Sequence, residues 1–244
     1  MLRLLPLLLL ACSCAWAQSP ERPLRVVTDY WPPFRMAGAD GQLEGLDIDL
    51  LHELEKRTGL RFEIRLQPWA RALEDMRSGQ ADLMTGLART PEREQYIDYL
   101  APFYYACSPR LYGPASRAAA VDSYQKLQGL RIGYVLQSAY FEPFDSDTSL
   151  LKVGVKNEDQ LLQMQLRGRV EVMIGTDCQV DFQLRDLDLG QRLVKLSYRP
   201  PSRTLLYLGL SRASEHDADR AVLEQALREL LRDQWLRQAA KAYR

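Results

Sequence analysis

Two stretches of the sequence decide the fold: Gly79-Gln-Ala-Asp-Leu-Met-Thr-Gly86 and Gly168-Arg-Val-Glu-Val-Met-Ile-Gly175. Glycine, an acidic residue, methionine and glycine fall at matching offsets in both. Each octet follows a segment of helical periodicity and contains an apolar run that is typical of a strand. The chain therefore contains one helix–strand unit twice, which indicates two similar α/β halves.

Around the octets the pattern extends to a βαβαβ order in the first half of the chain. Because parallel strands direct their carboxyl ends into one crevice, we expect ligands to bind there. The opening Leu24-Arg-Val-Val27 is repeated as Leu130-Arg-Ile-Gly133. The expected strands lie at residues 24–28, 61–66, 81–85 and 204–210, and the expected helices at 45–58, 68–79, 157–166, 217–231 and 233–243.

We predict an α/β fold of two Rossmann-like lobes joined by a two-strand hinge. The first lobe is expected to contain residues 24–110 together with 200–244, and the second residues 111–199. The strand at 204–210 would return the chain across the hinge, so that the last helices pack on the first lobe.

The charge balance excludes one class of partner. The 244 residues include 32 Lys+Arg and 32 Asp+Glu, so the formal charge is zero. A nucleic-acid groove needs a basic excess, and we therefore expect no nucleic-acid partner. The only long apolar run lies at the extreme N-terminus, so no internal membrane span is expected.

Residues 1–17 have the features of a secretory signal peptide: Arg3, a short apolar run, and Ala15-Trp-Ala17. Cleavage after Ala17 would export the chain to the periplasm. The alternative is lipoprotein processing at Cys12, although the apolar run before this residue is short. Cleavage leaves Cys107 and Cys178 in an oxidising compartment, where they form either a disulfide near the hinge or two buried free thiols.

The mature chain resembles the periplasmic solute-binding proteins of the polar amino-acid type, the two-lobed Venus-flytrap receptors of ABC importers. This resemblance implies a periplasmic binding protein-like II fold, a small-molecule ligand, an ABC-transporter permease as partner, and a monomer. It rests on Thr28-Asp-Tyr-Trp-Pro-Pro-Phe34, Gly45-Leu-Asp-Ile-Asp-Leu50, Pro68-Trp69, Gly79-Gln-Ala-Asp82 and Thr90-Pro-Glu-Arg93.

The resemblance also assigns a ligand site. Arg93 maps onto the arginine that clamps the ligand carboxylate, for which a guanidinium offers a planar, two-pronged fork. The alternative is a surface arginine paired with Glu92 or Glu94. The aspartate that would hold the ligand ammonium aligns near Thr176 or Asp177. Thr85, Gly86 and Ser138 complete the polar set, although the hydroxyl residues usual after Thr85 are replaced by Gly86, Leu87, Ala88 and Arg89.

Aromatic residues are expected at the rim of the crevice. Tyr30, Trp31 and Phe34 follow the first strand, and Trp69 begins a helix after another strand. Such rings can sandwich the apolar or cationic part of a ligand. The alternative is that Phe34 packs inside the lobe and only one aromatic faces the crevice.

Enzyme motifs are absent from the sequence. It contains no HExxH, CxxC or GxSxG, and both histidines are expected to be solvated. We therefore predict a binding protein for a small, polar, carboxylate-bearing solute, with no catalytic residue, metal or cofactor. Two alternatives stay open: a stand-alone ligand sensor, and a periplasmic dehydratase of the same fold that acts on a cyclic carboxylic acid through Asp177, Glu142, Arg89 and Arg93.

Overall fold

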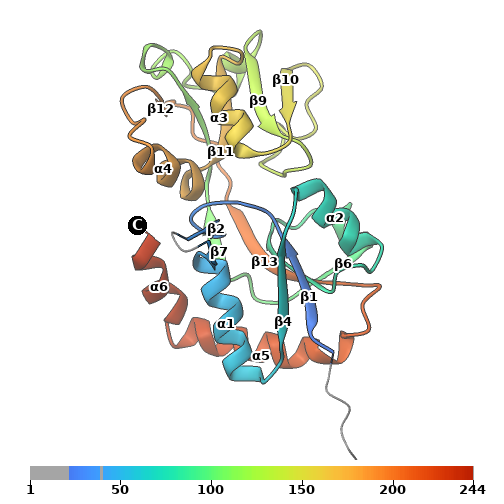
Figure 1. Cartoon of the computed structure of the whole chain (residues 1–244). Helices are drawn as coiled ribbons and strands as arrows, with labels where there is room; N and C mark the ends of the chain where they lie inside the picture. The colour runs from blue at the N-terminus through green and yellow to red at the C-terminus, as the bar shows by residue number, and fades with distance from the viewer. Residues whose placement is uncertain (1–21, 39–40, 244) are drawn as a thin grey trace, which may run out of the picture.

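The computed structural model describes residues 22–38 and 41–243. It shows two lobes, each built on a mixed β-sheet, and the chain crosses between them twice (Figure 1). The expected signal peptide lies outside the described residues. The predicted two-lobed α/β fold is confirmed.

The sheet of the first lobe has the strand order β4-β1-β5-β13-β6, and β7 also pairs with β13. Strands β1, β4 and β5 are parallel, whereas β13 is antiparallel to its neighbours. A strand from the end of the chain therefore lies inside this sheet. Its strands are β1 (Leu24–Thr28), β4 (Phe62–Leu66), β5 (Leu83–Leu87), β6 (Ile97–Tyr99), β7 (Tyr105–Cys107) and β13 (Thr204–Ser211), beside a small hairpin of β2 (Met36–Ala37) and β3 (Leu43–Glu44).

The sheet of the second lobe repeats this plan with the order β10-β9-β11-β8-β12. Strands β9, β10 and β11 are parallel, and β8 runs antiparallel to β11. The chain enters this lobe directly after β7 and leaves it before β13. Its strands are β8 (Pro109–Gly113), β9 (Arg131–Val135), β10 (Leu151–Val155), β11 (Val172–Thr176) and β12 (Val194–Lys195).

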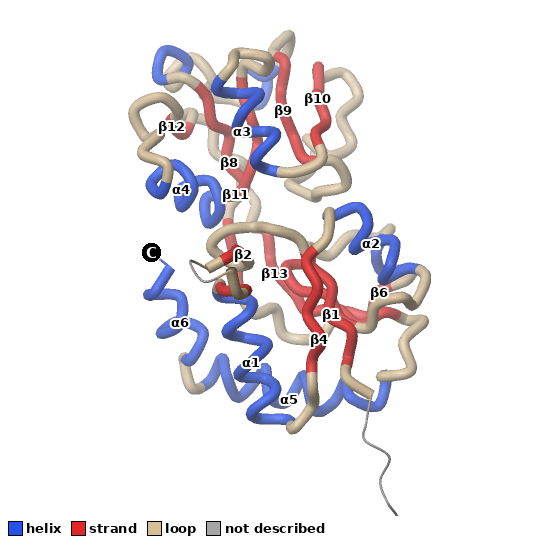
Figure 2. The backbone as a smooth tube through the Cα atoms, in the orientation of Figure 1, coloured by secondary structure: helices blue, strands red, loops and turns tan. Residues whose placement is uncertain are grey.

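Helices cover both faces of the first sheet, whereas in the second lobe α3 and α4 pack on one face and residues of loops and 3-10 turns, such as Leu127 and Phe141, cover the other (Figure 2). In the first lobe, α1, α5 and α6 pack together on one face and α2 covers the other. The described helices are α1 (Leu46–Thr58), α2 (Trp69–Arg77), α3 (Glu158–Leu166), α4 (Asp177–Asp186), α5 (Arg220–Arg232) and α6 (Trp235–Ala239), with 3-10 turns at Arg93–Gln95, Ala115–Arg117, Tyr124–Leu127, Asp217–Asp219 and Ala240–Tyr243.

Two local expectations need correction. Helix α4 was not predicted; it begins directly after β11 and buries Val180 and Leu184 at helical spacing. His216 is buried and not solvated, because it packs at the start of α5 and shares a hydrogen bond with Asp219 at 2.8 Å.

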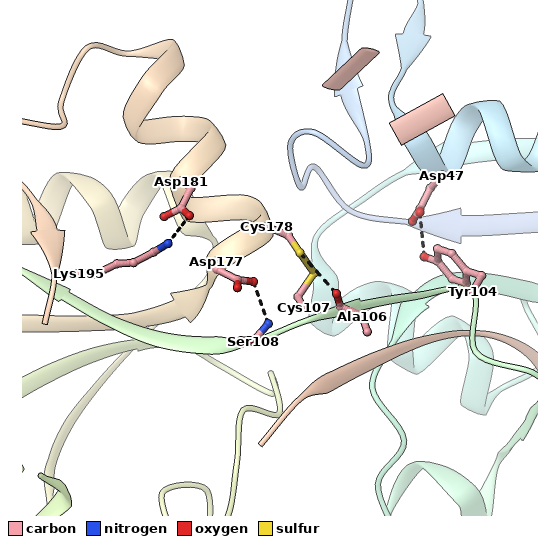
Figure 3. The surroundings of a disulfide bond; sticks show 9 residues. All are labelled: Asp47, Tyr104, Ala106, Cys107, Ser108, Asp177, Cys178, Asp181 and Lys195. Atoms are coloured by element: carbon pink, nitrogen blue, oxygen red, sulfur yellow. Dashed lines mark hydrogen bonds and ion pairs between the residues drawn. A yellow bond between two sulfur atoms is a disulfide. The ribbon is translucent and has the colours of Figure 1, made fainter. Parts of the chain in front are cut away.

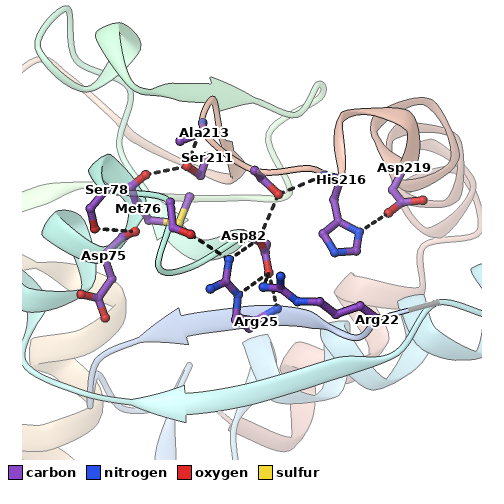
Figure 4. Close-up of polar contacts among 12 residues, drawn as sticks. Arg22, Arg25, Asp75, Met76, Ser78, Asp82, Ser211, Ala213, His216 and Asp219 are labelled. Atoms are coloured by element: carbon purple, nitrogen blue, oxygen red, sulfur yellow. Dashed lines mark hydrogen bonds and ion pairs between the residues drawn. The ribbon is translucent and has the colours of Figure 1, made fainter. Parts of the chain in front are cut away.

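Asp82, the last residue of one family-like motif, has a structural role at the far end of the first lobe (Figure 4). Arg25 donates to this carboxylate from its backbone N–H at 2.9 Å and from its guanidinium at 2.8 Å, and Ser214 donates at 3.0 Å. Burial alone would raise the pKa of Asp82, but these hydrogen bonds lower it to about 2. The motif therefore joins β1, β5 and the segment after β13.

A disulfide joins Cys107 at the end of β7 to Cys178 in the first turn of α4, with the two Cα atoms 5.6 Å apart (Figure 3). Beside it, the Ser108 N–H donates to the Asp177 carboxylate at 2.8 Å. Of the two hypotheses that the sequence left open, the structure shows the bridge. It lies where the chain first crosses between the lobes.

Removal of this bridge is expected to destabilise the protein. The cross-link closes a loop of 71 residues, and the loss of its chain-entropy effect should lower the free energy of unfolding by about 4 kcal/mol. The measurement is urea unfolding of the mature chain with both cysteines changed to alanine. Wild type unfolded under reducing conditions is the control and should show a similar loss; equal unfolding midpoints with and without the bridge would contradict the assignment.

Candidate functional site

A cavity of about 60 Å³ lies between the two lobes, where the parallel strands of both sheets end. It adjoins a wider groove of about 640 Å³, with which it shares part of its lining. Both lobes supply side chains to the cavity. From the first lobe come Asp29, Trp31, Arg35, Trp69, Gly86 and Arg93, and from the second Ser138, Tyr140, Glu158 and Thr176.

Arg93 is a buried cation without a carboxylate partner. Its side chain is 4% exposed, and it donates to the backbone carbonyls of Ala88 at 2.8 Å and Gln137 at 2.6 Å. No carboxylate of the described residues lies within ion-pair distance of it, since Glu92 pairs with Arg77 and Glu94 with Arg89. Burial lowers the pKa of Arg93. The surface-pair alternative is therefore not what the structure shows.

Gln137 receives two hydrogen bonds across the cleft. Its carbonyl, on the second lobe, accepts from Arg93 and from the Trp69 indole N–H at 3.2 Å, both on the first lobe. The φ angle of Gln137 is +62°, a left-handed conformation that costs a non-glycine residue free energy. The Arg93 guanidinium also lies 5.2 Å from the Trp69 ring centre. The lobes are thus held close together at this point.

Arg35, which the sequence analysis did not single out, is the second buried cation of the cavity. It is 1% exposed and donates to Asp47 at 2.5 Å and to Asp29 at 2.7 Å. Burial alone would lower the pKa of Arg35, but these carboxylates raise it. The one signal in the sequence was Asp47, an acid on the apolar side of a predicted helix.

The Arg35 guanidinium depends on a glycine. A side chain at Gly86 would place its Cβ 2.4 Å from Arg35 Nη1, so only glycine leaves room for this contact. The Gly86 N–H donates to the Tyr104 hydroxyl at 3.0 Å, and that hydroxyl donates to Asp47 at 2.8 Å. The predicted site residue Gly86 therefore shapes the cavity through its backbone.

Three buried side-chain oxygens in the cavity wall have no hydrogen-bond partner: Glu158 Oε2, Thr176 Oγ1 and Thr204 Oγ1. They are three of the five such atoms found among the described residues. Buried polar atoms are normally paired, and a concentration of unpaired ones marks a place where a ligand supplies the partners. Burial, with Asp29 adding to it, raises the pKa of Glu158 to about 8.

The structure brings five of the predicted ligand residues to the cavity: Trp31, Trp69, Gly86, Ser138 and Arg93. Tyr30 is 44% exposed and lines a separate hollow that also contacts Trp69.

Three predicted residues lie elsewhere. Phe34 is buried in the first-lobe core, which is the alternative that the sequence analysis gave for this residue. Its ring stacks on Trp31 with the ring centres 4.6 Å apart. Thr85 is fully buried and hydrogen-bonds to Thr28 at 3.2 Å. Asp177 is held by the Ser108 N–H at the hinge, whereas its neighbour Thr176 faces the cavity.

Among the described residues, no group of free metal-binding side chains lies in the cavity. In the described ranges, the one group of three side chains close enough to hold an ion is Cys107, Cys178 and Asp177. The two sulfurs of this group are already joined to each other. None of the described helices has the length and apolar character that a membrane span requires.

Two mixed-sheet lobes with a polar cavity at their facing strand ends define a two-lobed solute-binding protein. The chain belongs to the bacterial extracellular solute-binding proteins, family 3, whose sequence profile matches residues 24–244. This membership confirms the resemblance stated above. The family is one of binding proteins, in agreement with the prediction that the chain is not an enzyme.

Individual relatives are distant. A probable histidine-binding protein of Neisseria gonorrhoeae is 27% identical over 125 residues, which are 50% of this chain and 46% of that protein. A histidine-binding periplasmic protein of Salmonella typhimurium is 28% identical over 167 residues, 66% of this chain and 63% of that one. The matched region thus spans less than two thirds of these relatives.

Among solved structures, an amino acid ABC transporter substrate-binding protein from Streptococcus pneumoniae, bound to L-arginine, superposes with a TM-score of 0.79. The two sequences are 17% identical, and the match covers 91% of this chain and 93% of that chain. At this identity the likeness supports the fold alone.

Trp31 belongs to the packed core as well as to the cavity wall, since it is buried against Phe34 and the Arg35 guanidinium lies 5.0 Å from its ring centre. Trp31→Ala is therefore expected to lower the free energy of unfolding of the ligand-free protein by about 3 kcal/mol or more. Urea unfolding measures this loss. Tyr30→Ala, at the exposed neighbouring position, should change it by only about 0.5 kcal/mol; equal effects of the two substitutions would contradict the placement of Trp31.

Proposed function

We propose that the protein captures a small, polar, carboxylate-bearing solute, namely an amino acid, between its lobes and delivers it to an ABC-transporter permease. The observation that carries this proposal is the buried Arg93 guanidinium, which faces the cavity and has no carboxylate partner within the described part of the chain. A ligand carboxylate would supply that partner in a bidentate geometry. Histidine, for which two of the relatives are named, belongs to the same chemical class.

The position of the cavity explains how binding would change the shape of the molecule. Arg93 belongs to the first lobe, whereas Ser138 and the unpaired Thr176 hydroxyl belong to the second. A ligand that contacts both lobes binds the closed form better than the open form, so it shifts the equilibrium toward closure. The permease would then recognise the closed form, and a monomer suffices for this cycle.

The dehydratase alternative receives no support from the site. Asp177 is bound to the backbone at the hinge, and Arg89 is paired with Glu94. Glu142 accepts a hydrogen bond from Ser146 and lines the wider groove without lining the inner cavity. Arg89 and Glu142 line the wider groove together with Arg93, whereas Asp177 does not line it, so the four groups do not form one acid–base set. The sensor alternative uses the same cavity and differs only in the downstream partner.

A periplasmic location belongs to the same proposal. It is supported by the signal-like residues 1–17, which lie outside the described part of the chain, and by the periplasmic relative from Salmonella. The disulfide between Cys107 and Cys178 is consistent with an oxidising compartment. Lipidation at Cys12 stays the alternative route of processing.

Arg93→Ala is expected to weaken amino-acid binding by about 2–5 kcal/mol, because the ligand carboxylate would be buried without its cation. Arg93→Lys should restore only part of the affinity, since lysine lacks the planar fork. Isothermal titration calorimetry of the mature protein, with the amino acid that raises its melting temperature most, measures both effects.

Arg212→Ala is the matched control, because Arg212 is an exposed arginine of the same lobe that pairs with Asp98 at 2.9 Å. It should leave the affinity unchanged. If the Arg93→Ala protein binds the same amino acid as tightly as wild type does, the proposed clamp is refuted.

A further inference from the structure

The charged groups of the cavity can be sorted by whether they already have a partner. Arg35 binds both Asp29 and Asp47, so each of these carboxylates already has a cation partner within the first lobe, although one cation shared by two carboxylates leaves this group with a net negative charge. Two groups remain among the described residues that line the cavity: the Arg93 guanidinium and the Glu158 carboxyl group. One comes from each lobe, and both line the same cavity of about 60 Å³.

Glu158 is the first residue of α3, directly after Asn157, whose side chain accepts a hydrogen bond from the Gln160 N–H at 2.9 Å. The Oε2 atom of Glu158 is buried and has no hydrogen-bond partner. No described cation lies within ion-pair distance of this carboxyl group. The Oε2 atom of Glu158 is therefore an unused hydrogen-bond acceptor in the cavity wall.

We propose that Glu158 accepts the ammonium group of the ligand and gives up a proton when the ligand binds. This inference rests on the proposed function, because an amino acid brings a carboxylate for Arg93 together with an ammonium group that needs its own acceptor. The resemblance placed an acidic acceptor for this ammonium group at Thr176 or Asp177, but neither residue presents a carboxylate to the cavity. Thr176 offers a hydroxyl, and Asp177 is held at the hinge by Ser108.

The surroundings of Glu158 explain why the proton would be present before binding. Burial and the nearby Asp29 raise the pKa of Glu158 to about 8, while Arg35 lowers it and Asp159 on the same helix raises it. Tyr140, whose hydroxyl accepts a hydrogen bond from the Val135 N–H at 3.0 Å, also lines this cavity. At pH 7 the carboxyl group is therefore mostly protonated in the empty protein.

Binding of a zwitterion changes this balance. The ammonium group keeps its proton, the Glu158 O–H bond breaks, and that proton leaves to the solvent, so the bound state pairs a carboxylate with an ammonium ion. With a pKa of about 8, the larger part of one proton per ligand is released at pH 7. Since the empty protein must lose a proton to bind, affinity rises with pH up to about 8 and levels off above it.

The test starts from a thermal-shift screen of the twenty common L-amino acids with the mature protein. The strongest binder is then titrated calorimetrically in buffers of different ionisation enthalpy, which counts the protons released. Its deaminated analogue, with hydrogen in place of the amino group, is titrated in the same way. The protein variants are Glu158→Gln and, as matched control, Asp159→Asn, an equivalent change at the exposed neighbouring position.

We expect wild type and Asp159→Asn to release close to one proton per amino acid and none with the analogue. Glu158→Gln should bind the amino acid at least tenfold more weakly, release no proton, and no longer prefer it to the analogue. Affinity within twofold of wild type, or proton release that persists in Glu158→Gln, overturns the inference. The wild-type comparison of amino acid and analogue needs no variant, so a misfolded variant does not prevent the test.

The two proposals fail in different ways. If none of the amino acids raises the melting temperature, the proposed function is wrong and this inference falls with it. If an amino acid binds and Arg93→Ala abolishes binding while Glu158→Gln does not, the proposed function stands and the assignment of Glu158 is wrong.

Discussion

The buried guanidinium of Arg35 is the constraint on which the ligand-binding face of the first lobe depends. A charge taken out of water must be paired, and breaking a buried pair is costly because the remaining charge is left uncompensated. Arg35 meets this requirement with Asp29, which follows β1, and Asp47, on the first turn of α1. Tyr104, just before β7, then reaches Asp47 and the backbone of Gly86. Four segments of the first lobe are thereby joined around one cation, next to Trp31 in the cavity wall.

This internal pairing decides what the cavity offers to a solute. The carboxylates of Asp29 and Asp47 already share the Arg35 guanidinium, whereas the unpaired Arg93 and the unpaired Glu158 among the described residues lie on opposite lobes. The Arg93 guanidinium already donates one hydrogen bond across the cleft, to the Gln137 carbonyl. A ligand carboxylate therefore adds to an existing contact between the lobes, and it does not have to create the closed arrangement alone.

The fold could be predicted because its elements follow from local sequence patterns: helical spacing, β-branched runs and the repeated octet. The predicted cavity residues Arg93 and Ser138 could be found through the family resemblance, and Trp69 because it begins a helix after a strand. The partners of Arg35 could not, since they belong to different elements and meet only after these have packed. Glu158 was missed for a related reason: within Asn157-Glu158-Asp159 an acid is the ordinary start of a helix, and only the opposing lobe turns it into part of a binding site. The pairing of Cys107 with Cys178 likewise depends on a spatial approach that no spacing in the sequence reports.

The position of β13 in the middle of the first sheet has a consequence for the order in which the chain acquires structure. Residues 108–200 form a contiguous lobe, whose sheet is complete once β12 has been made. The lobe that begins the chain lacks an internal strand, and the helix α5 that covers one face, until residues 204–232 are available. On a chain that emerges from its N-terminus, the second lobe is therefore the first that can close its core. Until then the earlier segment has exposed edges on β5 and β6, and during that interval these edges are free to pair with other chains.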